Sequence, residues 1–329
     1  MTAQAVTPGP PHRRALSSAA LALVGVTVIW GSTFSLSKDL LTRIAVTDYL
    51  ALRFLLAALV VGLVRPRAIL RLDRRGALIG IALGLVYCAG QLLQFVGLKH
   101  TAATVSAFVV SMYVVFTPLL GALLLRVRPD RLTVLATVVA TAGVAAMSLR
   151  GYALGFGEVL TMVAALLYAV HILALGHWTS AGTAYPLTFV QLLTMGVCFL
   201  AIGAADGLHG PQWGDLLSFL YLSVVAGAVA MLVQTWAQAH VSAARAAVLM
   251  VLEPVWAAFF GFALWGETLD LRGVAGGSLV LVAMLFVVTT RRPAPGPPAA
   301  SMFSSRRRPG AARAPRQTPP GRQLEGRRP

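Results

Sequence analysis

The chain has 329 residues, of which 57% are hydrophobic and only 12% are charged, and its mean hydropathy is +0.78. A soluble domain of this length cannot bury so many apolar side chains in one core, so the composition indicates a polytopic membrane protein. The formal net charge of +16 would suit a nucleic-acid partner, but ten Arg and only one Glu lie in residues 291–329, so we expect no nucleic-acid binding.

Ten segments are long and apolar enough to be considered as membrane spans. A helix crosses the roughly 30 Å hydrocarbon core of a bilayer with about 20 mostly apolar residues. In chain order, the expected transmembrane helices are Ala15–Ser37, Asp48–Val64, Gly76–Leu98, Thr101–Leu125, Arg131–Leu149, Gly157–Trp178, Tyr185–Ala204, Leu216–His240, Ala243–Trp265 and Leu271–Thr290.

Basic residues assign the two sides of the membrane, because cytoplasmic loops carry the excess of Lys and Arg. An even number of spans with both termini inside places the larger set in the cytoplasm: Arg13, Arg14, Arg65, Arg67, Arg71, Arg74, Arg75, Arg126, Arg128, Arg131 and Arg245, against Lys38, Arg43, Lys99, Arg150 and Arg272 outside. We therefore expect a multi-pass protein of the cell inner (plasma) membrane. We expect residues 1–14 to form a cytoplasmic N-terminal segment and residues 291–329 to form a basic, disordered cytoplasmic tail.

The chain contains a weak internal duplication. A shift of 140 residues superposes Gln94–His100 on Gln234–His240, and Ala103, Ala107 and Gly121 on Ala243, Ala247 and Gly261. These matches occupy the same place in the span order of each half. They predict two five-helix repeats, residues 15–150 and 157–290.

Five spans per repeat is an odd number, so the second repeat must enter the membrane in the opposite orientation. Inverted repeats are the architecture of many secondary transporters, whose substrate sites lie near the midplane between the halves. The fold class predicted is an all-α membrane protein of ten transmembrane helices in two inverted five-helix repeats. The alternative is a ten-helix bundle with a purely structural duplication.

Several short motifs resemble those of EamA-type carriers of the drug/metabolite transporter superfamily. They are Trp30-Gly31-Ser32-Thr33-Phe34, Arg53-Phe54, Leu252-Glu253-Pro254-Val255 and Gly266-Glu267. The resemblance spans about residues 15–290 and implies ten helices in two repeats, no cofactor, and transport of small organic metabolites, frequently outward. Two features depart from it: Val114 follows Tyr113 where the family usually has Pro, and Arg126-Val127-Arg128 replaces a Gly-Glu pair.

Glu253 is the leading candidate for a functional residue. It lies ten residues into its segment, about 15 Å deep at 1.5 Å per residue, where an ionised acid carries an insertion penalty of roughly 2.5–3.5 kcal/mol. Such a carboxyl group can bind substrate or load and release a proton; the alternative is a structural hydrogen bond. Pro254 removes one backbone donor and frees the carbonyl of Met250, so the helix should bend there.

His171 and Tyr113 are further candidates. His171 lies well inside the sixth segment and could bind substrate or relay protons, alone or with Glu253, or simply be bonded to a neighbour. Tyr113 corresponds to Glu253 under the 140-residue shift, so it either lines the same cavity or bonds to an adjacent helix.

Polar or aromatic side chains elsewhere in the spans could contact a small uncharged solute. The candidates are Trp30, Gln91, Gln94, Gln234, Trp236 and Trp256. Interfacial anchoring for Trp and helix joining for Gln are the alternatives.

Arg53 lies five residues into the second segment, where it could extend to the interface, pair with Asp48 or attract an anionic substrate. Glu158, Asp48, Glu267 and Asp270 lie at segment ends and are expected to cap helices.

We expect a secondary active transporter of a small organic metabolite, working as a proton-coupled exporter by alternating access. The partners implied are a small-molecule substrate, protons and the lipid bilayer. The alternatives are a lipid-linked flippase and a non-transporting membrane scaffold. The patterns GxxxxGK[ST], HExxH and GxSxG are absent from the sequence, and Cys88 and Cys198 have no metal-binding spacing, so we expect no direct ATP use, no enzyme activity, no metal and no cofactor.

Overall fold

The computed structural model describes residues 10–124, 131–150, 153–203, 207–241 and 243–289. Over these residues the chain is helical apart from turns, loops and one pair of two-residue strands, in agreement with the predicted all-α class. The predictions made for residues 291–329 and for Arg126 and Arg128 fall outside the described residues.

The helices follow the predicted segments closely, with breaks that the sequence analysis did not specify. In the first half they are α1 Pro10–Leu40, α2 Val46–Val64, α3 Pro66–Ile69, α4 Arg74–Lys99, α5 Ala103–Val110, α6 Tyr113–Leu124 and α7 Arg131–Ser148. A short antiparallel pair, β1 Leu149–Arg150 and β2 Ala153–Leu154, joins the halves. In the second half they are α8 Phe156–Trp178, α9 Ala184–Gly203, η2 Trp213–Asp215, α10 Leu216–Leu220, η3 Tyr221–Val229, α11 Ala230–Gln238, α12 Ala243–Leu249, η4 Met250–Leu252, α13 Glu253–Trp265 and α14 Leu271–Thr289.

Seven helices of the described part are long and apolar enough to cross a membrane. They are Ser18–Leu40, Val46–Val64, Arg74–Lys99, Ala103–Leu124, Phe156–Trp178, Ala184–Gly203 and Trp213–Gln238. The other three predicted spans do not meet this criterion over the described residues. Within Ala243–Trp265 the 3-10 turn η4 separates α12 from α13. The count of ten spans therefore stays a prediction.

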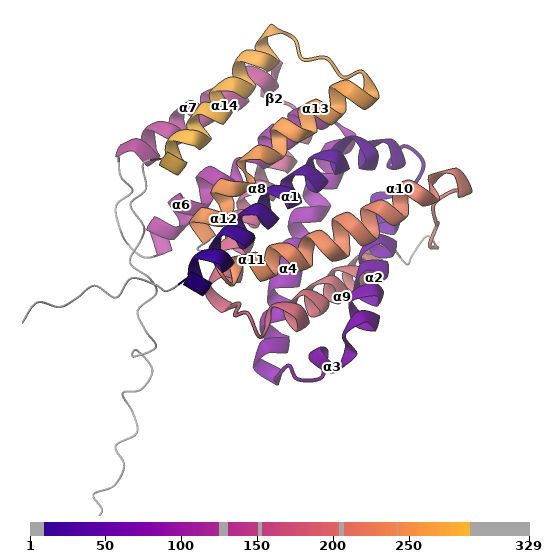
Figure 1. Cartoon of the computed structure of the whole chain (residues 1–329). Coiled ribbons are helices and arrows are strands. Elements are labelled where there is room, and N and C mark those ends of the chain that lie inside the picture. Colours follow the sequence, from indigo (N-terminus) through magenta and orange to yellow (C-terminus); the bar gives the residue numbers. More distant parts are fainter. Residues whose placement is uncertain (1–9, 125–130, 151–152, 204–206, 242, 290–329) are drawn as a thin grey trace, which may run out of the picture. The chain divides into compact units, whose positions relative to one another are not determined.

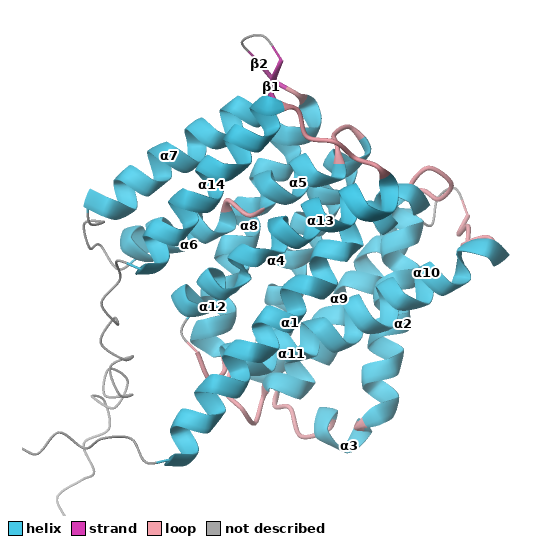
Figure 2. Cartoon of the chain, turned by 45° about the horizontal axis from the view of Figure 1, so that its top comes forward, coloured by secondary structure: helices cyan, strands magenta, loops and turns pink. Residues whose placement is uncertain are grey.

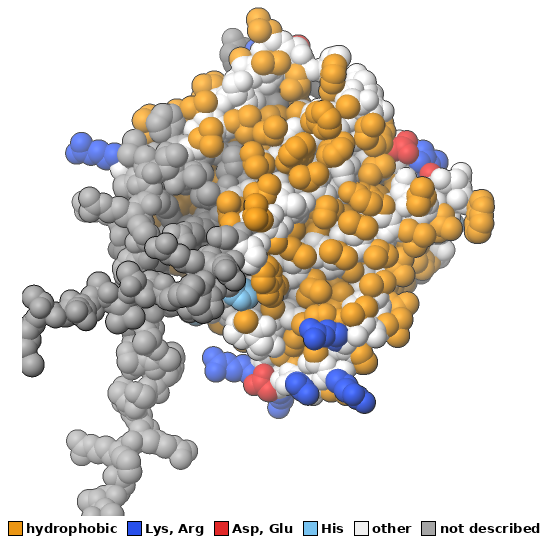
Figure 3. Space-filling model, in the orientation of Figure 1, with side chains coloured by type: hydrophobic (Ala, Val, Ile, Leu, Met, Phe, Trp, Pro, Cys, Tyr) orange, Lys and Arg blue, Asp and Glu red, His pale blue; other side chains and the backbone are white. Residues whose placement is uncertain are grey.

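The outer surface of the helices is apolar, as expected of a protein surrounded by lipid. In Figure 3 hydrophobic side chains cover most of the face between two groups of charged residues. Leu21, Leu63 and Phe262 are among the large apolar side chains that are about 70% exposed. Polar side chains such as Thr27, Gln191 and Thr235 are instead fully buried. Exposing the apolar side chains is favourable only if lipid covers them.

The first helix of each half packs into the other half. Helix α1 contacts α11 and α13, and its counterpart α8 contacts α4 and α6 (Figures 1 and 2). Likewise α2 contacts η3, and its counterpart α9 contacts α4, while α2 with α9 and α7 with α14 are direct pairs. The two halves are thus interlocked by matching sets of contacts.

Helices α1 and α13 approach most closely at Gly31. A Cβ atom added to Gly31 would lie 2.5 Å from the Cβ of Trp256, 2.9 Å from the backbone nitrogen of Ala257 and 3.0 Å from the carbonyl oxygen of Glu253. Only glycine therefore lets α1 pass directly beside the start of α13, as small residues do at membrane helix contacts.

Candidate functional site

A helix break positions Glu253 inside the bundle. The ninth predicted span divides into α12, the 3-10 turn η4 and α13, and Pro254 stands in the first turn of α13. The α-helical pattern is therefore interrupted directly before Pro254, where the sequence predicts a bend. The fourth predicted span, which corresponds to this one in the first half, is interrupted at the equivalent place: α5 ends at Val110 and α6 begins at Tyr113. No proline lies at that break. Short i to i−3 backbone bonds at Met112 and Val114 form that turn.

Tyr113 and Glu253 meet where the two breaks face each other. The Tyr113 hydroxyl lies 2.9 Å from Oε2 of Glu253 and 3.3 Å from the carbonyl oxygen of Met250, the group that Pro254 was predicted to free. Both side chains are buried, at 3% and 6% exposure. Tyr113 thus both lines the cavity described next and bonds to a neighbouring helix, so the two alternatives for this residue hold together.

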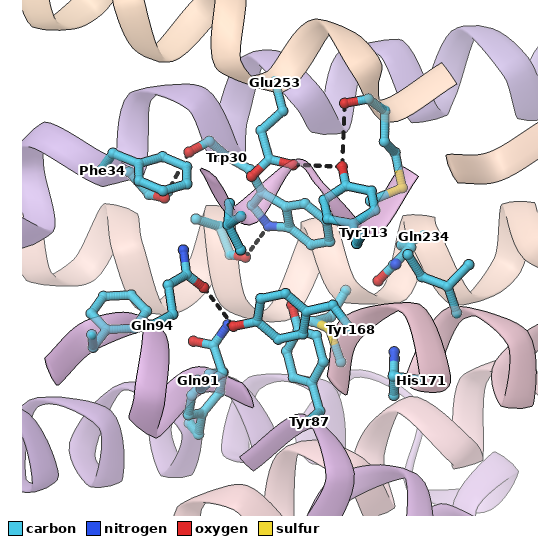
Figure 4. A pocket seen from close by; sticks show the side chains of 18 of the residues that line it. Trp30, Phe34, Tyr87, Gln91, Gln94, Tyr113, Tyr168, His171, Gln234 and Glu253 are labelled. Atoms are coloured by element: carbon cyan, nitrogen blue, oxygen red, sulfur yellow. Dashed lines mark hydrogen bonds between the residues drawn. The ribbon is translucent and has the colours of Figure 1, made fainter. Parts of the chain in front are cut away.

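These residues border a small cavity of about 50 Å³, which is lined by both polar and apolar side chains. Figure 4 shows Glu253, Tyr113 and Trp30 on one side of it and Gln91, Gln94, Tyr87 and Tyr168 on the other. About one water molecule needs 10–15 Å³ by this measure. The space accepts a few waters, so an organic solute requires the helices to move apart.

A chain of amide and phenol groups forms one wall. Nε2 of Gln91 donates to the Tyr168 hydroxyl at 2.8 Å, and that hydroxyl donates to Oε1 of Gln94. The Tyr87 ring lies beside that of Tyr168, with centroids 5.0 Å apart. This wall comes from α4 and α8 and combines aromatic faces with fixed hydrogen-bonding groups.

His171 lines the cavity but does not bond to Glu253. Its Nε2 lies 2.8 Å from Oε1 of Gln191, which accepts only, so Nε2 carries the proton and Nδ1 is a bare acceptor. The Tyr87 ring packs on the imidazole at a centroid distance of 4.6 Å. His171 is thus bonded to a neighbour, as one alternative held, and a direct relay to Glu253 is not formed in this structure.

Arg53 is buried in the same cavity. The side chain is 5% exposed, and three rings surround its guanidinium at 5.4–5.7 Å: Tyr49, Phe54 and Phe95. Its Nε donates to the carbonyl of Leu222 at 3.0 Å, and Nη1 to the Tyr49 hydroxyl at 3.1 Å. The expected extension to the interface or pairing with Asp48 is wrong, because π-helix η3 offers Arg53 a carbonyl inside the bundle.

Helix η3 also accepts a hydrogen bond from Trp30. The indole Nε1 donates to the carbonyl of Ala226 at 3.1 Å. A π-helix spaces its backbone bonds one residue further apart than an α-helix, and such segments occur often at functional sites. Trp30 on α1 and Arg53 on α2 thus both attach to one irregular helix of the other half.

Three buried acceptors along the cavity have no hydrogen-bond partner in the structure. They are Oε1 of Gln91, Oε1 of Gln234 and Nδ1 of His171. Buried polar groups are satisfied in most proteins, and exceptions often mark a binding site. Donors on a solute or on water could satisfy these acceptors.

Seven of the candidate residues therefore line one cavity: Glu253, His171, Tyr113, Trp30, Gln91, Gln94 and Gln234. Trp256 does not. Its ring lies beside Phe259 and Phe260, at centroid distances of 6.1 and 6.5 Å. The sequence analysis missed Tyr87 and Tyr168, whose signal was their helical spacing from Gln91 and His171.

Hydrogen bonds tie together the connections at one end of the helices. Lys38 donates to the carbonyl of Thr101 at 2.7 Å, and the carboxylate of Glu267 accepts bonds from the backbone of Ala103 and Thr104 at 3.1 Å. The expected capping role of Glu267 is thus present, at the start of α5. Arg43 bridges to Asp215 at 2.7 Å, and hydrogen bonds from its guanidinium to acids raise the pKa of Arg43.

A model of the EamA-like transporter family matches residues 17–149 and, a second time, residues 155–289. A protein of Archaeoglobus fulgidus, described as an uncharacterized transporter, is 28% identical over 270 residues, which cover 81% of this chain and 84% of that protein. A second A. fulgidus protein with the same description is 26% identical over 213 residues, covering 60% and 71%. One crystal structure aligns with a TM-score of 0.62 at 17% identity, covering 83% of this chain and 96% of that one, which shows a shared fold alone.

Proposed function

We propose that this chain, which belongs to the EamA-like transporter family, is a secondary carrier that exports a small organic solute in exchange for protons. The family and the relatives support a multi-pass membrane transporter rather than an enzyme. The solute, the coupling ion and the alternating-access cycle are parts of the proposal. Its binding site is the cavity between the halves.

The observation that carries the proposal is the environment of Glu253. Its carboxyl group is 6% exposed, borders the cavity and begins the helix that follows a break. Carboxyl groups buried at membrane depth are rare and mark proton or substrate pathways. Among the described residues that line this cavity, Glu253 is the one acid.

The Tyr113 hydroxyl accommodates both protonation states of Glu253. When Glu253 is ionised, the hydroxyl donates to Oε2 at 2.9 Å. When Glu253 is protonated, its O–H can donate to the Tyr113 oxygen, and the hydroxyl can turn to the carbonyl of Met250 at 3.3 Å. Each state therefore keeps its hydrogen bonds, which suits a group that exchanges a proton during transport.

Two features support inverted repeats with alternating access. Tyr113 and Glu253, which correspond under the 140-residue shift, contact each other, as pairs do near a two-fold axis. The reciprocal contacts of α1 and α8 have the same symmetry. Inverted repeats give a carrier two related conformations, open to opposite sides.

We assign the end at α3 to the cytoplasm, because exposed Arg65, Arg67, Arg71, Arg74 and Arg75 lie there. The tied end, with Lys38 and Glu267, then faces outward, and its hydrogen bonds are the proposed outer gate. In the proposed cycle, solute from the cytoplasm binds when Glu253 is ionised. A proton from outside later displaces it, since proton and solute compete for this group.

The test is transport by purified protein in proteoliposomes, with a panel of amino acids, hydroxy acids, nucleosides and cationic drugs. An imposed proton gradient should drive solute movement in the wild type and fail to do so in Glu253→Gln, while exchange of solute for solute persists. Asp73→Asn, which changes an exposed carboxylate at the start of α4, is the matched control. Gradient-driven transport that is unchanged in Glu253→Gln rejects the coupling role. Movement of lipid-linked substrates alone would instead favour a flippase, and movement of none a scaffold.

A further inference from the structure

Resting on the carrier function proposed above, we propose that the solute carries a carboxylate, which Arg53 binds, and a hydrogen-bond donor at its other end.

Arg53 is a buried cation without a carboxylate partner. No Asp or Glu oxygen lies within 4.0 Å of its nitrogens among the described residues. Asp48, the nearest acid in sequence, accepts the backbone N–H of His209 at 3.1 Å instead. An unneutralised cation inside the membrane is costly and points to a substrate or ion pathway. An anion from outside the protein is therefore expected beside Arg53.

The guanidinium keeps donors available for that anion. Arginine has five N–H donors in a planar fork, and the structure uses Nε and one donor of Nη1. The bonds to Leu222 and Tyr49 fix the plane of the group and leave Nη2 without a hydrogen-bond partner among the described residues. A carboxylate matches this geometry better than a single-point acceptor does.

Glu253 does not neutralise Arg53. Both line the cavity, but no ion pair joins them, and the contact of the Glu253 carboxyl group is the Tyr113 hydroxyl. The cavity thus presents a fixed cation and a separate acid. A solute that spans it meets Arg53 with its anionic end and Glu253 with a donor.

The acceptors without partners support a donor at that second end. Oε1 of Gln91, Oε1 of Gln234 and Nδ1 of His171 are all buried and unsatisfied. An ammonium or hydroxyl group on the solute would satisfy one or more of them. Such a group also competes with the proton at Glu253, as an exchanger requires. Amino acids and hydroxy acids are the smallest solutes that combine a carboxylate with such a donor.

The test is binding of defined probes to the full-length protein in lipid nanodiscs, measured by calorimetry. The probes are lactate and alanine, each compared with its primary amide, lactamide or alaninamide, so that the carboxylate is the one group changed in shape-matched pairs. We expect at least one carboxylate to bind. Its amide should bind at least about tenfold more weakly, because the amide loses a charge-assisted hydrogen bond. Binding of lactate alone or alanine alone identifies the donor as hydroxyl or ammonium.

Arg53→Lys should weaken carboxylate binding about tenfold, because it keeps the charge and loses the fork. Arg67→Lys, on exposed α3, is the matched control and should bind as the wild type does. Equal binding of acid and amide, or no binding of either acid, overturns the proposal even if Arg53→Lys fails to fold. Transport of cations or nucleosides without carboxylate binding would support the carrier function and reject the carboxylate site. Carboxylate binding without transport would support the site and reject the carrier function.

Discussion

Replacing Gly31 by alanine should push α1 away from the start of α13 and disturb the helix that holds Glu253. The added Cβ would meet the Cβ of Trp256 at 2.5 Å and backbone atoms at 2.9 and 3.0 Å. None of these is the end of a flexible side chain, so a backbone has to move. Overpacking of this kind costs about 1–3 kcal/mol.

Gly25→Ala on the same helix supplies the matched control. A Cβ at Gly25 meets nothing within 4 Å, so that variant gains only the roughly 0.5–1 kcal/mol by which alanine favours a helix. Since both variants share this gain, their difference isolates the contact with α13. We expect Gly31→Ala to be less stable than Gly25→Ala by about 1–3 kcal/mol.

The assay is reversible unfolding in mixed detergent micelles, followed by solute transport for the folded fraction. Gly31→Ala should also transport more slowly, because Glu253 stands at the contact, while Gly25→Ala should transport like the wild type. Equal stability and equal transport in the two variants would refute the close approach of α1 and α13 and the reasoning built on it.

Tyr113→Phe removes the hydroxyl that bonds to Glu253. We expect gradient-driven transport to fall at least tenfold, because a hydrogen bond to a charged group contributes about 1.5–3 kcal/mol. Unchanged transport rates in proteoliposomes would contradict this. Trp30→Phe should weaken solute binding severalfold, whereas Trp256→Phe should leave calorimetric affinity unchanged because that ring lies outside the cavity; equal effects would argue against the site. Glu267→Gln should loosen the tied end, seen as faster labelling, by an external thiol reagent, of a cysteine introduced into the cavity, and labelling at the rate found without Glu267→Gln would argue against the seal.

Hydropathy and residue spacing were enough to locate Glu253 and its partner. The penalty for a buried acid singled out Glu253, Pro254 predicted the break, and the 140-residue shift paired it with Tyr113. Their contact could not be foreseen from either helix alone, because it arises from the way the two halves face each other. The break before Tyr113 lacks the helix-breaking residue that marks its counterpart, so the sequence contained no local signal for it.

Arg53 and Trp256 show that position along a helix does not by itself predict where a side chain lies. Depth alone suggested that Arg53 extends to the interface, but the carbonyl of Leu222 in η3 holds it inside. Trp256 is three residues from Glu253, yet its side chain packs beside Phe259 and Phe260. Tyr87 and Tyr168 could have been predicted from the sequence. Tyr87 lies four residues from Gln91 and Tyr168 three residues from His171, so each shares a helix face with a candidate residue.

Coupling through Glu253 can be measured with a pH-sensitive dye inside proteoliposomes, which reports proton movement when a transported solute is added. We expect solute to trigger proton flux through the wild type and through Asp73→Asn, and Glu253→Gln to abolish this flux while still exchanging labelled solute. Solute-triggered proton flux of wild-type size in Glu253→Gln would contradict this coupling.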